Sequence, residues 1–442
     1  MTTAIRHDDT PEPFPAESAS LAQRLQAGYR QAEAGTPSSD TLLINEQSRL
    51  LEAGGRRIHK FGFGQSPFPV FAPAVAALAE HAGEKAYLPV QGLAALREQV
   101  AAFHRATDET AWEAQRVVVG PGSKLLLFAL MKSLPAADIL IPAPAWVSYA
   151  PQAHLAGQRA VRLEAEFETR WQVTAEQLDA CCRDAPERLK VLILNAPGNP
   201  TGLSPDAESQ QRLAEVARRH GVLVLADEIY AMLDHAGAHR AFARDYPEGT
   251  VTTSGLSKWC GAGGWRLGVM HVPAALGDEL FQRVIGLASE TWSSVTSPVQ
   301  YAAITAYTLT PALTAYVARQ RMILAELGEA CANRLSAAGV RVHAPDGGFY
   351  LFPDFGAFRE SLARRGITTS AELTRRLLDE AGVALLPGSA FGCRPEQLTA
   401  RLAYVDFDGA ALLDGEGAVL DHPASRSLLE GIEALVAWLE QG

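Results

Sequence analysis

The sequence predicts an α/β fold, with a large domain built on a mostly parallel sheet flanked by helices and a smaller α+β domain after it. The main observation is that short apolar runs alternate with helical stretches between residues 116 and 272. Short apolar runs bounded by turn residues are typical of buried strands, and strands that alternate with helices favour a parallel sheet. After a long helix predicted over 311–338, the pattern changes to short strands with few helices.

The elements of the large domain are predicted from apolar periodicity and from the turn residues between them. In chain order they are helices over 72–81 and 93–104, a strand over 116–119, a helix over 125–134, strands over 138–141 and 190–194, a helix over 205–220, and strands over 222–226, 250–253 and 267–272. Residues 1–20 are expected to form a flexible tail, and residues 21–70 an N-terminal arm with part of the small domain. Residues 71–325 are assigned to the large domain and residues 326–442 to the small C-terminal domain.

The smaller domain is predicted from weaker signals. Its expected elements are strands over 340–343, 348–352 and 399–405, a helix over 370–381 and a closing amphipathic helix over 425–441. The acidic, glycine-rich stretch 406–424 is expected to be a surface loop.

Composition and charge exclude several classes of protein. The chain has 442 residues, of which 48% are hydrophobic and 20% charged, so it can bury a large core. Its net charge of −11 argues against a nucleic-acid-binding protein, which would present a basic face. Five cysteines with no C-x-x-C pair argue against a disulfide framework or a structural metal site. No apolar run reaches the ~18 residues that span a bilayer and the N-terminus lacks the apolar segment of a signal peptide, so we expect a cytoplasmic protein without a membrane partner.

The chemistry is predicted to centre on residues 254–268, which read Ser-Gly-Leu-Ser-Lys-Trp-Cys-Gly-Ala-Gly-Gly-Trp-Arg-Leu-Gly. Arg266 follows Lys258 by eight positions, after an uncharged, glycine-rich linker. A lysine amine can form a Schiff base with a carbonyl, and the planar guanidinium of arginine suits a phosphate. A carbonyl and a phosphate on one small molecule suggest pyridoxal 5′-phosphate (PLP). A surface lysine and arginine beside a glycine-rich turn are the alternative, because such turns are common.

Three further motifs follow predicted strands, where the ligands of open α/β sheets bind. Gly120-Pro-Gly-Ser-Lys124 joins a strand to a helix and can offer backbone N–H groups and a helix dipole to a phosphate, although one glycine turn is a weak signal. Asn195-Ala-Pro-Gly-Asn-Pro-Thr-Gly202 predicts a rigid, irregular turn whose X-Pro bonds can be cis. Asp227 follows five apolar residues, and burial of its charge is costly unless it is paired, for example with a protonated pyridine nitrogen.

Some residues admit two interpretations. Trp146, just past a predicted strand, can stack on a flat ring or pack in the core. Tyr87 can bind a ligand from a loop or cap the core. Gly64 allows a backbone amide to approach a ligand closely, but a plain turn is the simpler explanation of that stretch alone.

The order of these motifs resembles that of the class I/II aminotransferases. The matching residues are Asn195-x-Pro-x-Asn199-Pro-Thr-Gly202, Asp227-Glu-x-Tyr230, Ser257-Lys258 with Arg266 eight positions later, and Arg401 in an Arg-Leu-Ala-Tyr strand. Four separated motifs in the right order are a specific match, which covers roughly residues 60–440. The resemblance implies the PLP-dependent transferase fold type I with a seven-stranded sheet, and a homodimer with shared active sites.

The resemblance also implies a role for each matching residue. Lys258 would hold PLP as a Schiff base and shuttle a proton between substrate and cofactor, while Asp227 would keep the pyridine nitrogen protonated. Tyr230 and Asn199 would hydrogen-bond the phenolate oxygen of the ring, and Trp146 would stack on it. The other residues implied to contact the cofactor are Gly122, Ser123, Lys124, Ser257 and Arg266. Tyr87 and the loop near Thr296 and Ser297 would reach the cofactor from the second subunit. The residues implied to contact the substrate are Gly64, Trp146, Asn199 and Arg401.

Two positions bear on specificity. Gly255 stands where many members of the family carry a phosphate-binding serine, and Ser257 or Ser254 can replace it. Lys124 is the candidate for a cation that binds the distal carboxylate of an acidic substrate. The equal alternative is that Lys124 is a solvent-exposed lysine in the first turn of a helix. The amino donor therefore stays open between acidic and aromatic or neutral amino acids.

We therefore predict an L-amino acid:2-oxo acid aminotransferase with a ping-pong cycle, aspartate or an aromatic amino acid as donor and 2-oxoglutarate as the partner acid. Another PLP reaction on the same fold, that of a lyase, a decarboxylase or a cyclase, is the first alternative because it would use the same lysine. A non-catalytic PLP-binding sensor domain is the second, and it is disfavoured because the residues before the matching region are acidic rather than basic.

Overall fold

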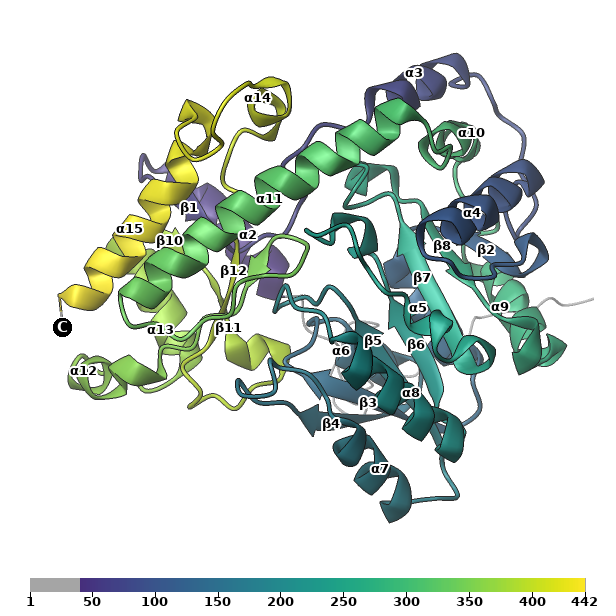
Figure 1. Ribbon diagram of the computed structural model, residues 1–442, viewed down its shortest axis with the longest axis horizontal. Coiled ribbons are helices and arrows are strands. Elements are labelled where there is room, and N and C mark those ends of the chain that lie inside the picture. Colours follow the sequence, from purple (N-terminus) through teal and green to yellow (C-terminus); the bar gives the residue numbers. More distant parts are fainter. Residues whose placement is uncertain (1–39, 442) are drawn as a thin grey trace, which may run out of the picture. The chain divides into compact units, whose positions relative to one another are not determined.

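The computed structural model of the protein describes residues 40–441 (Figure 1). The predicted tail, residues 1–20, and residues 21–39 of the predicted arm lie outside this part of the chain. Within residues 40–441, no helix combines the length and the apolar character that crossing a membrane requires.

A seven-stranded sheet forms the centre of the large domain, in the order β2-β8-β7-β6-β5-β3-β4. Its strands are β2 (Val117–Gly120), β3 (Ala137–Ala143), β4 (Arg159–Glu164), β5 (Leu189–Asn195), β6 (Leu223–Asp227), β7 (Thr250–Gly255) and β8 (Gly268–His271). Neighbouring strands run parallel, except that β8 is antiparallel to both β2 and β7. The predicted mostly parallel sheet is confirmed.

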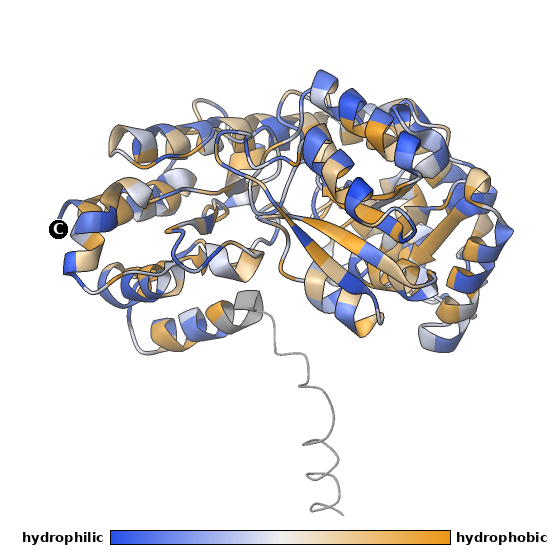
Figure 2. Cartoon of the chain, turned by 90° about the horizontal axis from the view of Figure 1, so that it is seen from below, coloured by the Kyte–Doolittle hydropathy of each residue, from blue (hydrophilic) through white to orange (hydrophobic). Residues whose placement is uncertain are grey.

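Helices cover both faces of this sheet, because successive side chains of a strand point to opposite sides. Ile139 and Val191 pack on one face with α5 (Ser123–Ser133), α6 (Tyr149–Leu155) and α9 (Asp278–Thr291). Their chain neighbours Leu140 and Leu192 pack on the other face with α7 (Ala175–Asp184) and α8 (Ala207–His220). In Figure 2 the strands are largely orange, whereas the helices carry both hydrophobic and hydrophilic segments.

Local sequence signals fix the ends of the helices. Asp206 precedes α8, and its Oδ1 accepts a hydrogen bond from the N–H of Ser209 at 2.8 Å. Gly221 ends the same helix in the left-handed conformation, at a φ of 62°, which glycine adopts without a steric cost. Thr310 caps the long helix α11 (Pro311–Ala337), whose first residue is proline.

The smaller part of the fold is built around a three-stranded antiparallel sheet in the order β11-β12-β9. Its strands are β9 (Tyr350–Leu351), β11 (Leu386–Pro387) and β12 (Ala400–Ala403), and a separate parallel pair is formed by β1 (His59–Lys60) and β10 (Val383–Ala384). The remaining α-helices are α2 (Asp40–Ala53), α3 (Ala72–Glu80), α4 (Ala94–Thr107), α10 (Ser297–Ala306), α12 (Arg359–Arg364), α13 (Ser370–Arg376), α14 (Gly409–Asp414) and α15 (Arg426–Glu440). Helix α11 runs without a break across residues 325 and 326, so the division into two domains at that point stays a prediction.

Three differences from the sequence prediction concern an expected strand, an expected loop and an edge strand. The expected strand over 340–343 is a single bridge between Arg341 and Asp354. Residues 406–424 are not a plain surface loop, because they contain α14 and bury Leu412 and Val419 in the core. The edge strand β4 was not predicted, since its side chains are mostly exposed or half-buried and give no apolar run.

Candidate active site

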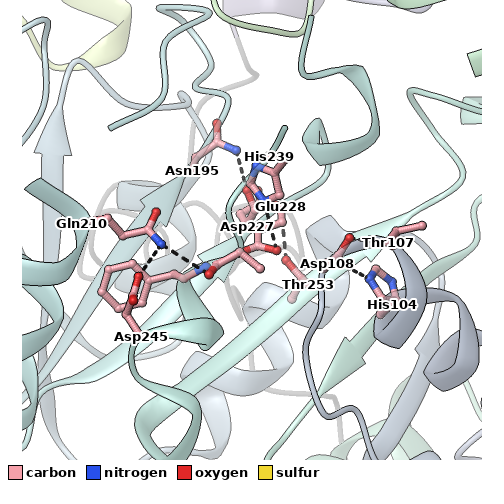
Figure 3. A network of polar contacts seen from close by, with 12 residues as sticks. His104, Thr107, Asp108, Asn195, Gln210, Asp227, Glu228, His239, Asp245 and Thr253 are labelled. Atoms are coloured by element: carbon pink, nitrogen blue, oxygen red, sulfur yellow. Dashed lines mark hydrogen bonds and ion pairs between the residues drawn. The ribbon is translucent and has the colours of Figure 1, made fainter. Parts of the chain in front are cut away.

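Three neighbouring strands end at one edge of the sheet and bring their last residues together. Asp227, the last residue of β6, lies beside Asn195 of β5 on one side and Thr253 of β7 on the other (Figure 3). β7 ends at Gly255, and Lys258 follows three residues later. Asp227 and Lys258 therefore lie at the carboxyl ends of parallel strands, the edge where open α/β sheets bind their ligands.

The carboxyl group of Asp227 is buried and held by two hydroxyl groups. The residue is 3% exposed. The hydroxyl of Tyr149 donates to its Oδ2 at 2.8 Å, and the hydroxyl of Thr253 donates to its Oδ1 at 3.2 Å. Burial raises the pKa of Asp227 to about 6, and the two hydrogen bonds act in the opposite direction. A buried carboxylate of this kind is stabilised by a cationic partner.

The amine of Lys258 lies among aromatic rings and a backbone carbonyl. Its Nζ donates to the backbone oxygen of Gly64 at 2.9 Å, and lies 5.4 Å and 5.6 Å from the ring centres of Tyr230 and Phe349. Burial, and after it the charge of Arg401, lowers the pKa of Lys258 to about 8. A sizeable fraction of the amine is therefore neutral near physiological pH, and the neutral amine is the nucleophile.

The N-terminus of α5 and Arg266 form a cradle for an anion. Gly122 precedes the helix at a φ of 86°, and within residues 40–441 no side-chain cap bonds to the first N–H groups. Arg266 donates to the backbone oxygens of Pro121 at 3.2 Å and Gly263 at 3.0 Å. A Cβ atom on Gly122 would collide with this guanidinium. The backbone conformation therefore favours glycine there, and any side chain would also have to displace the end of Arg266.

Arg401 of β12 reaches the same region from the smaller part of the fold. It is 1% exposed, its Nη1 donates to Oδ1 of Asn199 at 3.2 Å, and its Nη2 donates to the backbone oxygen of Gly62 at 2.5 Å. Its Nε has no partner within residues 40–441. The rings of Tyr350 and Phe391 lie 4.9 Å and 5.1 Å from the guanidinium carbon. Such an arginine can bind a carboxylate of a ligand through two hydrogen bonds.

Comparison with known proteins identifies the chemistry that this geometry serves. Residues 58–406 match the family described as aminotransferase class I and II. The chain belongs to the class I and II aminotransferases. It is 36% identical over 382 residues to the aspartate aminotransferase of Geobacillus stearothermophilus, and the aligned region covers 84% of this chain and 92% of that protein. It is 30% identical over 363 residues to the probable aspartate/prephenate aminotransferase of Aquifex aeolicus, where the aligned region covers 80% of this chain and 89% of that protein.

The likeness extends to solved structures of aminotransferases. The aspartate aminotransferase from Thermus thermophilus with maleate superposes with a TM-score of 0.79 and 25% sequence identity, covering 95% of this chain and all of that one. The predicted fold type I is therefore confirmed, together with the predicted family.

This aminotransferase is PLP-dependent, as its family is, and its own residues fit that cofactor. The cradle of Gly122 and Arg266 suits a phosphate, because it combines free N–H groups with a guanidinium. The buried carboxyl of Asp227 complements a cationic ring nitrogen. The amine of Lys258, with its lowered pKa, suits a carbonyl carbon.

Helix α6 links the residues around the expected ring position. Trp146 precedes the helix and lies edge-on to Tyr149, with 5.3 Å between ring centres. The Nζ of Lys124 lies 5.4 Å from the ring centre of Trp146, and Nε2 of Gln152 donates to the backbone oxygen of Lys124 at 2.8 Å. Lys124 is accessible to solvent, yet burial and then the charge of Arg266 lower its pKa. Lys124 is thus an exposed first-turn lysine of α5 that also lies beside the ring of Trp146, so both interpretations of this residue stay open.

The serines near Lys258 and the predicted Tyr87 are placed differently. A Cβ on Gly255 would lie 2.8 Å from the backbone oxygen of Leu267, so this position has no room for a serine. Ser254 is buried in β7, whereas Ser257 is half-buried beside Lys258. Tyr87 is 93% exposed, and it therefore adds nothing to the site of its own chain.

Sequence reasoning missed three residues that the structure places in the site. Tyr149 and Thr253 hold the Asp227 carboxyl, and the hydroxyl of Tyr350 lies 2.8 Å from that of Tyr230. A signal existed for the first of these, because Tyr149 follows Trp146 after a predicted strand. Thr253 and Tyr350 lie inside predicted strands, where a polar side chain has no sequence signature of its own.

A separate cavity of 1090 Å³ lies on the side of the strand ends that faces α7 and α8. Its walls include Glu228 and His239, whose Oε2 and Nε2 are 3.4 Å apart, and it meets the site at Tyr149, Asn195 and Asn199. Figure 3 shows Glu228 and His239 beside Asp227. Because Lys258, Arg266 and Arg401 are not on its walls, we place the chemistry outside this cavity.

Proposed function

We propose that this aminotransferase takes its amino group from an acidic L-amino acid, aspartate above others, and passes it to a 2-oxo acid such as 2-oxoglutarate in a ping-pong cycle. The observation that carries the proposal is the position of Lys124, a cation next to the ring of Trp146 and close to Arg266. A cation at this place can bind the second carboxylate of a dicarboxylic substrate. The relatives named as aspartate aminotransferases support the same choice.

PLP supplies an electron sink for the electrons that are released when the substrate loses its α-proton. Asp227 would stabilise the positive charge on the ring nitrogen, for which its burial and its two hydroxyl donors prepare it. Tyr230 and Asn199 would hydrogen-bond the phenolate oxygen, and Trp146 would stack on the ring. Gly122, Ser123, Lys124, Ser257 and Arg266 would hold the phosphate.

Lys258 performs the proton transfer in this proposal. Its Nζ takes the proton from the substrate Cα and returns it to the cofactor, which requires a neutral amine at the pH of the reaction. The lowered pKa of Lys258, caused first by burial and then by Arg401, meets that requirement.

Arg401 binds the α-carboxylate of the substrate. Its guanidinium is buried and its Nε is unpartnered among the described residues, so a carboxylate would supply both the missing acceptor and the missing counter-charge. Asn199 already orients the guanidinium through its Oδ1. The glycine segment of Gly62 and Gly64, which contacts Arg401 and Lys258 through its carbonyls, lines the same end of the site.

A homodimer with shared active sites is part of the proposal. Tyr87 is almost fully exposed, and the hydroxyl of Ser297 donates to the backbone oxygen of Ala86 at 2.6 Å, so the two predicted intersubunit segments lie together. Mixing Lys258→Ala chains with Tyr87→Ala chains should restore part of the lost activity, because each mixed dimer would hold one intact site. No recovery on mixing, with both variants dimeric, would contradict shared sites.

Initial rates measured over a grid of aspartate and 2-oxoglutarate concentrations test the proposed reaction. Parallel double-reciprocal lines and equal amounts of oxaloacetate and glutamate are expected. Phenylalanine in place of aspartate should give a lower kcat/KM; a higher value would favour the aromatic donor that the relative named as aspartate/prephenate aminotransferase also suggests. Formation of carbon dioxide or an eliminated side chain in place of an amino acid product would contradict transamination.

A further inference from the structure

Tyr149 holds a position that the functions described above do not explain. It is the first residue of α6 and is 2% exposed, in the core cluster beneath the sheet. Its hydroxyl donates to Oδ2 of Asp227 at 2.8 Å. This is shorter than the 3.2 Å bond from Thr253 to Oδ1, so Tyr149 is the stronger of the two donors.

The hydroxyl is held in place by the packing of α6. The Tyr149 ring lies edge-on to Trp146, and its backbone N–H donates to the Trp146 carbonyl at 3.1 Å. One turn later, Gln152 ties the helix to the backbone of Lys124. The phenyl ring therefore keeps its place without its hydroxyl, and Tyr149→Phe removes one hydrogen bond rather than the fold.

The hydrogen bond from Tyr149 affects whether the Asp227 carboxyl or the ring nitrogen of PLP holds the proton between them. Burial alone makes the Asp227 carboxyl more basic, and the hydroxyl donors oppose that effect because they stabilise the carboxylate. A more basic carboxyl would compete with the ring nitrogen of PLP for the proton between them. Tyr149 cannot itself give up its proton, since burial and the Asp227 charge raise its pKa well above the ordinary value.

From this geometry we propose that Tyr149 is a positioning residue which keeps Asp227 ionised, so that the ring nitrogen of the bound cofactor carries the proton. The inference rests on the proposed contact between Asp227 and that nitrogen. It adds to the reaction a residue that touches neither substrate nor cofactor but sets the electron-withdrawing power of the ring. Thr253 acts in the same direction from the other carboxylate oxygen, and more weakly.

The direct test is the nitrogen NMR shift of the holoenzyme loaded with PLP that carries ¹⁵N in its ring. This shift reports ring protonation, which a merely structural residue would not change. The wild type should show a protonated nitrogen. Tyr149→Phe should raise the pKa of Asp227 by about one to two units and move the resonance toward that of neutral pyridine. Thr253→Val should move the resonance less, in the same direction. This second variant tests the same effect if Tyr149→Phe does not bind PLP.

Two further variants separate the possible outcomes. Tyr307→Phe is the matched control, because Tyr307 is fully buried and its hydroxyl has no hydrogen-bond partner within the described chain. The ring-nitrogen resonance of PLP in this variant should equal that in the wild type. Asp227→Asn should move the resonance most. If Asp227→Asn moves it and neither Tyr149→Phe nor Thr253→Val does, the role of Tyr149 is refuted while that of Asp227 stands. If Asp227→Asn has no effect, the proposed contact of Asp227 with the ring is refuted as well.

Discussion

The hydroxyl oxygens of Tyr230 and Tyr350 lie 2.8 Å apart inside the protein, with the guanidinium of Arg401 4.9 Å from the centre of the second ring. Burial raises the pKa of both phenols, so both keep their protons. Only one of the two protons can lie in the bond between them. The pair therefore has a second O–H group to donate to a ligand in the site, and Tyr350 orients Tyr230.

Tyr350→Phe removes this orienting bond without removing the ring that packs against Arg401. We predict that kcat/KM with aspartate falls about two- to tenfold, because a buried hydrogen bond contributes about 0.5–1.5 kcal/mol and 1.4 kcal/mol corresponds to a factor of ten. Steady-state kinetics check the prediction, with Tyr307→Phe as the control for loss of a buried hydroxyl. An unchanged kcat/KM in Tyr350→Phe would show that Tyr230 needs no second tyrosine.

The lowered pKa of Lys258 predicts how the cofactor-free protein captures PLP. Only the neutral amine attacks the aldehyde, so the capture rate should rise with pH through a midpoint near 8, the pKa to which burial and Arg401 bring this lysine, rather than near its ordinary value of 10.5. Stopped-flow absorbance at a series of pH values measures the midpoint. Arg401→Gln removes a nearby positive charge and should move the midpoint upward; a shift downward or none would disprove the assigned cause.

Lys124→Ala should distinguish acidic from aromatic donors. If the ammonium binds the distal carboxylate, kcat/KM for aspartate should fall about 10- to 100-fold, as expected for one charge-assisted hydrogen bond worth about 1.5–3 kcal/mol, while that for phenylalanine should change little. Lys132→Ala, an exposed lysine in the last turn of the same helix, is the control. Equal losses with both substrates would assign Lys124 to the cofactor phosphate alone.

Gly255→Ser tests whether this chain can accept the serine that many members of its family carry. The Cβ would lie 2.8 Å from the Leu267 carbonyl, so we expect the strain to destabilise the protein by about 1–3 kcal/mol and PLP binding not to improve. Chemical denaturation and PLP titration give the two quantities. Gly286→Ser in α9, where a Cβ meets open space, is the control. Tighter PLP binding in Gly255→Ser would mean that the turn adjusts and supplies a phosphate ligand.

The parts of the site that lie in continuous motifs could be predicted from the sequence. Asp227 ends one buried strand, Asn199 lies in the turn after another, and Lys258 and Arg266 share one glycine-rich segment, so local pattern and strand order brought them to one edge of the sheet. Asp227 is buried as predicted, and the bonds before Pro197 and Pro200 are cis, as the rigid turn allows.

Other features depend on tertiary contacts that no local pattern contains. Tyr350 meets Tyr230 across 120 positions of the chain, and its neighbours read only as a strand. Glycine and acidic residues around α14 predict a loop, yet burial of Leu412 stabilises the helix against the core. In each case, packing against distant residues outweighs the local preference.

The most direct single measurement is the visible absorption of the PLP-loaded protein when aspartate is added without any 2-oxo acid. A ping-pong aminotransferase should lose its yellow colour, release one oxaloacetate per active site and then stop. Addition of 2-oxoglutarate should restore the colour and release an equal amount of glutamate. A yellow protein whose spectrum does not change with aspartate, or with any other amino acid tried in the same way, would contradict the proposed transamination.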